Sequence, residues 1–128
     1  MEHPNSELYR RITAAFQAGD TDMLRSAVAS DVRWHEAGNP EVIEGRDAVM
    51  QRMSAAAQLD NKIDLHDVLA NDEHVVAMLN VELTKPDGSQ VAYPVVEIAH
   101  VKDGQVTERW AFMDAVPDDV TEFFAGLA

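Results

Sequence analysis

The sequence lacks cysteine altogether. A chain without cysteine has no disulfide framework, no thiol nucleophile and no thiolate metal ligand. It also lacks any apolar run that approaches the ~18 residues of a membrane-spanning helix. The first residues, MEHPNSELYRR, contain no apolar signal region. We therefore expect a cytoplasmic protein that does not enter the membrane.

Basic residues are scarce, because 10 Lys and Arg stand against 23 Asp and Glu and give a net charge of −13. Such a chain repels phosphates, which argues against binding to nucleic acid or to an anionic membrane. The chain has no H-x-H or HExxH motif, and no spacing motif links His66, His74 and His100. Gly-rich phosphate loops and Ser-based nucleophile elbows are also missing. We expect neither a metal nor a cofactor.

What the sequence does contain fits one globular domain over residues 1–128, with 46% hydrophobic and 26% charged residues. The first half has the 3.6-residue period of helices, and from residue 62 the period becomes 2. Helices are predicted from a cap at Asn5 or Ser6 to Gly19, from a cap at Asp20 or Thr21 to about Val28, and over about Arg46–Gln58. Strands are predicted over Asp31–Glu36, Lys62–Ala70, His74–Thr84, Gln90–Lys102 and Gln105–Asp114. Residues 37–44 are predicted to be a loop, and Pro117 to begin a short C-terminal helix.

This order predicts an α+β fold with a mixed, mainly antiparallel sheet and helices grouped on one face. The strand HVVAMLNVEL is apolar on both faces, whereas a sheet covered on one side only would alternate cleanly. The second face therefore needs a cover, and we expect a second copy of the chain to supply it. The alternative is that the C-terminal helix closes this face.

Four local features together resemble one family: AFQAGDTDML; DVRWHE followed by GRDAVMQRM; the hairpin VKDGQVTERW; and Asp114 four residues after Trp110. In this order they resemble the nuclear-transport-factor-2-like superfamily, in its SnoaL-like and ketosteroid isomerase-like branch. The resemblance implies a cone, in which a strongly curved sheet wraps around three helices and leaves a deep, mostly apolar pocket. Members are often dimers. They include isomerases, polyketide cyclases, an epoxide hydrolase, dehydratases and binding proteins without chemistry, so the fold alone does not assign a function.

Asp114 is the first candidate for chemistry. If Trp110 faces the cone, a constant period of 2 places Phe112 and Asp114 on the same face. Poor solvation there would favour the protonated carboxyl group and suit it to proton transfer. The resemblance adds that SnoaL-like cyclases carry their acid/base aspartate in the matching place. The alternative is a strand-end aspartate that caps the turn before Pro117.

Glu97 is the second candidate, because it interrupts the apolar run VAYPVVEIAHV. A buried charge is unfavourable unless it is paired or protonated. The resemblance matches Glu97 with the oxyanion-hole aspartate of ketosteroid isomerase, which stays protonated and donates a hydrogen bond. The alternative is an ion pair with Arg109 across the hairpin.

His35 and Glu36 form the third candidate. The resemblance places them where ketosteroid isomerase carries its general base, and period 2 lets only one of them face inward. The alternative is a His35 in an ordinary hydrogen bond with Glu36 in solvent. Tyr9 is the candidate for that family's oxyanion tyrosine. The predicted pocket-lining side chains, for which core packing is the alternative, are Trp34, Trp110, Phe16, Met53, Met78 and Phe112.

These residues predict a cofactor-independent acid/base enzyme that isomerises or cyclises a small apolar carbonyl or polycyclic compound. An epoxide hydrolase would need an Asp–Arg–Asp relay, of which only Arg109 and Asp114 are obvious. The alternatives are a small-molecule binding domain without catalysis and a protein-interaction module with a filled cone.

Overall fold

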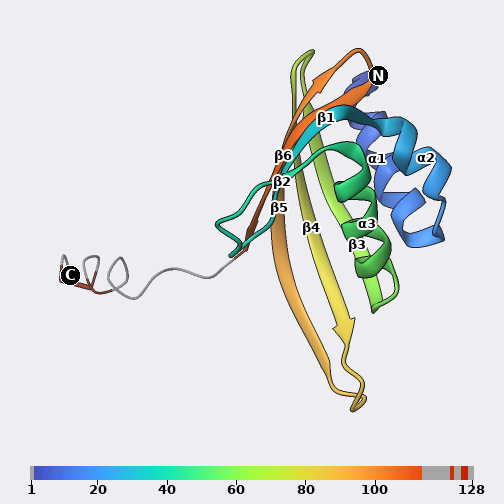
Figure 1. The fold of residues 1–128 in the computed structure, drawn as a ribbon. Helices are drawn as coiled ribbons and strands as arrows, with labels where there is room; N and C mark the ends of the chain where they lie inside the picture. Colours follow the sequence, from blue (N-terminus) through green and yellow to red (C-terminus); the bar gives the residue numbers. More distant parts are fainter. Residues whose placement is uncertain (1, 114–121, 123–124, 127–128) are drawn as a thin grey trace.

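The computed structural model of the chain describes residues 2–113, 122 and 125–126. Figure 1 shows its helices packed on one face of a curved sheet. The helices are α1 (Pro4–Ala18), α2 (Thr21–Ala27) and α3 (Arg46–Ala57). The strands are β1 (Val28–His35), β2 (Ile43–Glu44), β3 (Asp60–Ala70), β4 (His74–Thr84), β5 (Gln90–Lys102) and β6 (Gln105–Met113). The predicted C-terminal helix falls largely outside the described residues.

The described strands form one six-stranded sheet in the order β2-β1-β6-β5-β4-β3. Strands β1 and β6 run parallel, and every other neighbouring pair is antiparallel. A parallel pair needs a long connection, which the chain supplies through α3 and the hairpins that follow it. The predicted α+β fold with a mixed, mainly antiparallel sheet is therefore confirmed, as is the curvature of that sheet around three helices.

The first strand and its neighbour differ from the prediction. Strand β1 begins at Val28 rather than Asp31, because Val28 and Ala29 are buried and the chain passes from α2 straight into the sheet. Residues 43–44, predicted to be loop, pair with Arg33 and Trp34 as β2. A two-residue strand contains too few positions to show a period of 2.

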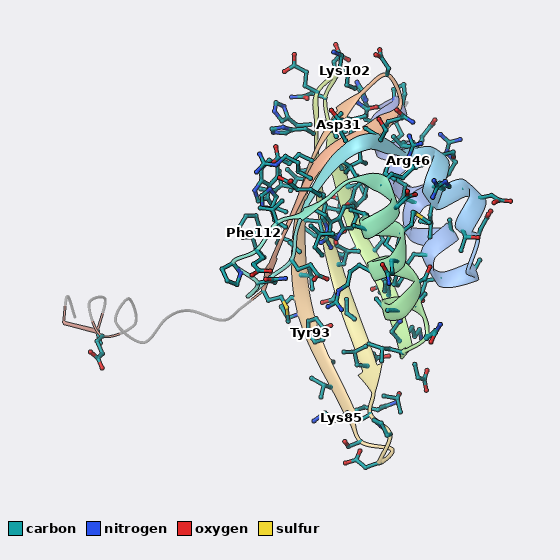
Figure 2. All side chains as sticks on the ribbon, viewed as in Figure 1. Asp31, Arg46, Lys85, Tyr93, Lys102 and Phe112 are labelled. Carbon is teal, nitrogen blue, oxygen red and sulfur yellow. The ribbon has the colours of Figure 1, made fainter. Side chains whose placement is uncertain are left out.

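A bulge at Thr107 sets which side chains of β6 face the helices. Val101 lies opposite Val106, but the next pair joins His100 with Glu108, so Thr107 is an extra residue. The alternation of β6 shifts at this point, and a constant period of 2 from Val106 does not hold. Figure 2 accordingly shows Phe112 on the side of the sheet that faces away from the helices.

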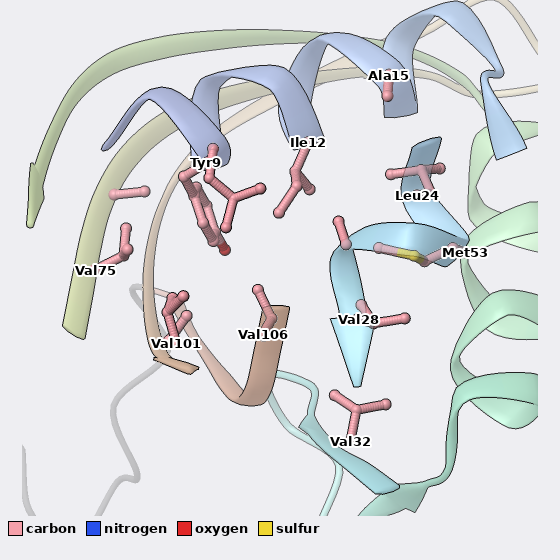
Figure 3. Packing of buried hydrophobic residues seen from close by; sticks show 14 of the residues in the cluster. Tyr9, Ile12, Ala15, Leu24, Val28, Val32, Met53, Val75, Val101 and Val106 are labelled. Carbon is pink, nitrogen blue, oxygen red and sulfur yellow. The ribbon is translucent and has the colours of Figure 1, made fainter. Parts of the chain in front are cut away.

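The core lies between the inner face of the sheet and the three helices. Figure 3 shows Tyr9 and Ile12 of α1 pointing toward Val101 and Val106 of the last hairpin. At the end of the sheet near the Asp103-Gly104 turn this packing is tight, and the fully buried side chains include Val28, Val32, Val49, Val75 and Val106. Packing loosens toward the other end of the sheet, where a cavity opens.

Candidate functional site

A cavity of about 480 Å³ lies between the inner face of the sheet and helices α1 and α3. Its volume falls within the range of roughly 300–1,000 Å³ that is typical of small-molecule sites. Of the predicted pocket residues it includes Tyr9, Phe16, Trp34, Met53, Glu97 and Arg109, together with Glu36. Aliphatic walls come mainly from Ile12, Ile63, Leu79, Val81, Leu83 and Val95.

Three side chains from distant parts of the chain meet in the cavity wall and form the Tyr9–Glu97–Arg109 cluster. The hydroxyl of Tyr9, on α1, donates a hydrogen bond to Glu97 Oε1 at 2.7 Å. Arg109 Nη2, on β6, donates to Glu97 Oε2. Glu97 sits opposite Ala111 on β6, and Arg109 sits opposite Ala99 on β5, so the two side chains meet diagonally on the inner face.

Arg109 has two further contacts that hold it in place. Its Nη1 donates to the backbone carbonyl of His35 at 3.4 Å, and its guanidinium carbon lies 4.3 Å from the ring centroid of Trp34. The parallel pairing of β1 with β6 explains the second contact, because it sets Trp34 directly opposite Arg109. A guanidinium over an indole face is a favourable cation–π arrangement. Arg109 Nε is buried without a hydrogen-bond partner among the described residues.

The cluster is poorly solvated, since the side chains of Arg109 and Glu97 are only 12% and 15% exposed. Burial works against the charge on Arg109, but its contacts with Glu97 and Tyr9 together more than offset this effect and raise the pKa of Arg109 above its usual value. Burial, with the nearby charge of Glu97, raises the pKa of Tyr9 well above 10. Tyr9 is thus a neutral donor and Arg109 a permanent cation.

The raised pKa of Tyr9 predicts an alkaline loss of stability. The folded state holds the Tyr9 proton more tightly than the unfolded state, so this stabilisation is complete below about pH 10 and is lost as the pH rises further. In the Tyr93→Phe variant Tyr9 is the remaining tyrosine, and its ultraviolet absorbance should show ionisation only well above pH 10. Ionisation at an ordinary pH in this folded variant would contradict the buried hydrogen bond.

Glu36, and not His35, faces the cavity. Glu36 follows β1 directly, and Arg52 Nε of α3 donates to both of its carboxylate oxygens, at 3.0 and 2.7 Å. His35 lies opposite Trp110 on the outer face, where its ring stacks on the indole at 5.0 Å. His35 Nε2 also lies 2.7 Å from Glu108 Oε2. Of the two predicted candidates, the structure therefore places Glu36 at the cavity and His35 on the outer face.

The prediction that Trp110 and Phe112 line the pocket is corrected by the bulge at Thr107. Beyond it, Trp110 pairs with Ile98 and Phe112 with Val96 on the outer face, where Phe112 is 51% exposed. Met78 lies on the same outer face, opposite Val96. The predicted acid/base residue Asp114 lies outside the described residues.

Arg52 belongs to the site although no sequence pattern predicts it. It is 16 positions from Glu36, with a loop, a short strand and a helix start between them, so no local pattern connects the pair. Among the described residues, no group of three or more potential ligands is placed to hold a metal ion. No described helix is both long and apolar enough to span a membrane.

Comparison with known proteins gives a family and a fold. Residues 9–109 match the model of the SnoaL-like domain. Similar solved structures include a provisionally assigned SnoaL-like polyketide cyclase from Jannaschia sp., 21% identical, covering 89% of this chain and 90% of that one with a TM-score of 0.77. An LEH-like epoxide hydrolase of M. tuberculosis is 20% identical over 95% of this chain and 87% of its own, with a TM-score of 0.75. No curated protein matches the chain significantly.

Proposed function

Because this chain belongs to the SnoaL-like family, we propose that it is a cofactor-independent enzyme that isomerises or cyclises a small, apolar, carbonyl-bearing or polycyclic compound. The observation that carries the proposal is one cavity that combines aliphatic walls with Glu36 and the Tyr9–Glu97–Arg109 cluster. Proton transfer next to a carbonyl needs a positioned base and donors for the developing oxyanion. The cavity contains both kinds of group.

The geometry supports a division of roles. Glu36 is the group that accepts the proton. Arg109 supplies hydrogen-bond donors for an enolate-like oxygen, in a site where poor solvation strengthens such contacts. Glu97 accepts hydrogen bonds from both Tyr9 and Arg109, which suits a carboxylate. We therefore assign Glu97 to orienting Arg109, in place of the protonated oxyanion donor that the ketosteroid isomerase resemblance implied.

A binding domain without catalysis is the second candidate. One observation favours it: both carboxylates already have a partner in the chain, Glu97 in the cluster and Glu36 in Arg52. Such pairs can orient a ligand without reacting with it. The cavity does not fit the filled cone expected of a protein-interaction module. Turnover of a bound compound separates the enzyme from the binding domain.

The first test is thermal unfolding against apolar ketones, steroids, polycyclic aromatics and epoxides. A ligand at ~100 times its dissociation constant stabilises a fold by about 2.7 kcal/mol, which raises the midpoint by several degrees. Compounds that raise the midpoint are then incubated with the protein and analysed for isomerised or cyclised products. Binding without any product would favour the binding domain.

Asp114 remains a candidate for the same chemistry through the family resemblance. We expect Asp114→Asn to lower turnover ~100-fold or more, because the amide cannot exchange a proton. Turnover of a substrate from the panel is the measurement, and circular dichroism verifies the fold. Unchanged turnover would remove Asp114 from the mechanism and leave Glu36 as the proton-transfer group.

We also propose that a second copy of the chain covers the outer face of the sheet. This face exposes Leu69, Val96 and Phe112 around Trp110, which packs against His35 and His100. We expect Phe112→Asp to yield a monomer in analytical ultracentrifugation, because dimerisation would bury the unpaired carboxylate of the new aspartate in the interface. The matched control is Leu59→Asp, at an exposed leucine beyond α3. A wild-type protein that sediments as a monomer would overturn this proposal.

A further inference from the structure

The cavity has a polar end and an apolar end, which narrows the class of molecule that fits it. At the polar end stand Arg109 and Glu97. Along β4, away from that end, burial falls steadily, because Ala77 is fully buried, Leu79 nearly so, and Leu83 only half-buried. The cavity therefore opens toward the β4–β5 hairpin.

The polar end carries no net charge. Arg109 contributes a cation and Glu97 an anion, and the two are in direct contact with little exposure to solvent. A ligand carboxylate placed here would set a second anion beside Glu97 around one guanidinium. Desolvation of an ion is unfavourable unless a counter-ion is free to compensate it, and Glu97 already occupies that place. The polar end therefore selects against anionic head groups.

The polar end still offers hydrogen-bond donors. A guanidinium carries five N–H groups, and the hydrogen bonds to Glu97 and to the carbonyl of His35 use two of them. Arg109 lines the cavity, so the unused N–H groups on Nη1 and Nη2, rather than the buried Nε, are the donors that a ligand would meet. The complementary head group is an uncharged oxygen that accepts a hydrogen bond.

The apolar end is a trough along two strands. Leu79 and Val81 of β4 pair with Val95 and Tyr93 of β5, and all four side chains line the cavity. The four-residue step from Glu97 to Tyr93 spans about 14 Å, at roughly 3.4 Å per residue. Leu83, nearer the hairpin turn, also lines the cavity, and Figure 1 shows the β4–β5 hairpin continuing beyond the helices.

We infer that the cavity binds a neutral, elongated amphiphile, with a carbonyl or hydroxyl oxygen against Arg109 and an apolar body along Val81, Leu83 and Tyr93. This inference rests on the proposed function and specifies its substrate class. Arg109 and Glu97 determine the head group that is accepted, and Leu83 with its neighbours determines the length of the body.

The test uses the purified chain and two ligand series at pH 7, linear methyl ketones and linear carboxylates of matched lengths from hexyl to dodecyl. Calorimetric titration should show each ketone binding at least about tenfold more tightly than the matching carboxylate. Ketone affinity should rise about fourfold per added methylene until the trough is filled, and then level off. Equal or tighter binding of carboxylates, affinity independent of chain length, or no binding of either series would overturn the inference.

Two variants assign the effects to residues. Glu97→Gln removes the negative charge that balances Arg109, so a ligand carboxylate can pair with the guanidinium. The preference for ketone over carboxylate should therefore fall at least about tenfold. Leu83→Lys should weaken the binding of the long ketones and leave the affinity for the short ketones unchanged. The matched control is Glu82→Lys, at the neighbouring exposed position on the opposite face, which should change neither series. If Glu97→Gln fails to fold, the head-group comparison on the wild-type protein decides alone.

These results separate the ligand class from the proposed chemistry. Ketones that bind as described but are never converted would support the inferred ligand class and contradict the proposed enzymatic function. The protein could instead convert a carboxylate or a compact polycyclic compound and show no preference for elongated neutral ligands. That result would contradict the inferred ligand class and support the proposed enzymatic function.

Discussion

Replacing Arg109 by methionine should lower the free energy of unfolding by about 3–5 kcal/mol, because the variant leaves the carboxylate of Glu97 buried without its cation. Methionine keeps an unbranched apolar stem but is shorter than arginine, so lost packing of the guanidinium adds to the effect of the unpaired charge. The contact with Trp34 also loses its cationic partner. Chemical denaturation measures the change as a shift in midpoint with the slope unchanged.

The matched control is Arg33→Met, which removes a half-exposed arginine whose partners are Glu44 and Glu108 on the outer side of the same sheet. Exposed ion pairs contribute no more than about 1 kcal/mol to the free energy of unfolding, so this control should lose at most that much stability. The double variant Arg109→Met/Glu97→Leu should recover most of the lost stability, since it removes both charges together. A single variant no less stable than the control would show that the Glu97–Arg109 pair is not buried in solution.

Replacing Glu36 by glutamine should lower turnover of a panel substrate ~100-fold or more, because the amide keeps the shape of the side chain and cannot accept the proton. Folding stability should change little, since the partner Arg52 is half-exposed and such pairs contribute at most about 1 kcal/mol. Steady-state kinetics should show the loss in kcat, with KM nearly unchanged, because the interaction acts in the transition state.

Glu44→Gln serves as the control for Glu36, since Glu44 lies on β2 beside the same strand and its carboxylate is exposed. It should keep full turnover. If Glu36→Gln also keeps full turnover while Asp114→Asn loses it, the base is Asp114. If both variants keep it, neither carboxylate transfers the proton.

The long antiparallel strands were the most predictable part of the fold. Both β4 and β5 are long apolar runs rich in valine and are separated by the strong turn signal Lys85-Pro86-Asp87-Gly88, so local sequence contains what defines them. Strand β1 was less predictable, because its parallel partner β6 lies more than 70 residues later. That pairing sets Trp34 inward and His35 outward, and it decides between His35 and Glu36.

The candidate site was predictable in its residues more than in its contacts. Glu97 was identified because a charge in an apolar run requires a partner, and the ion pair with Arg109 was already the alternative. The hydrogen bond from Tyr9 joins positions 88 residues apart, and no local period contains it. The inward orientation of Arg109 depends on the bulge at Thr107, which leaves no mark in the hydrophobic pattern of the hairpin.

The bulge at Thr107 also makes the positions of β6 unequally tolerant of changes in the length of the strand. A substitution at Thr107 leaves the backbone count intact, so the inner and outer faces keep their side chains. A one-residue deletion of Thr107 would remove the extra residue and still leave Arg109 on the inner face and Trp110 on the outer face, whereas a one-residue insertion directly after Glu108 would exchange the faces of the residues that follow. Descendants of this chain can therefore lose or replace Thr107 and keep the cavity, whereas an insertion after Glu108 would alter the cavity and the outer surface in a single step.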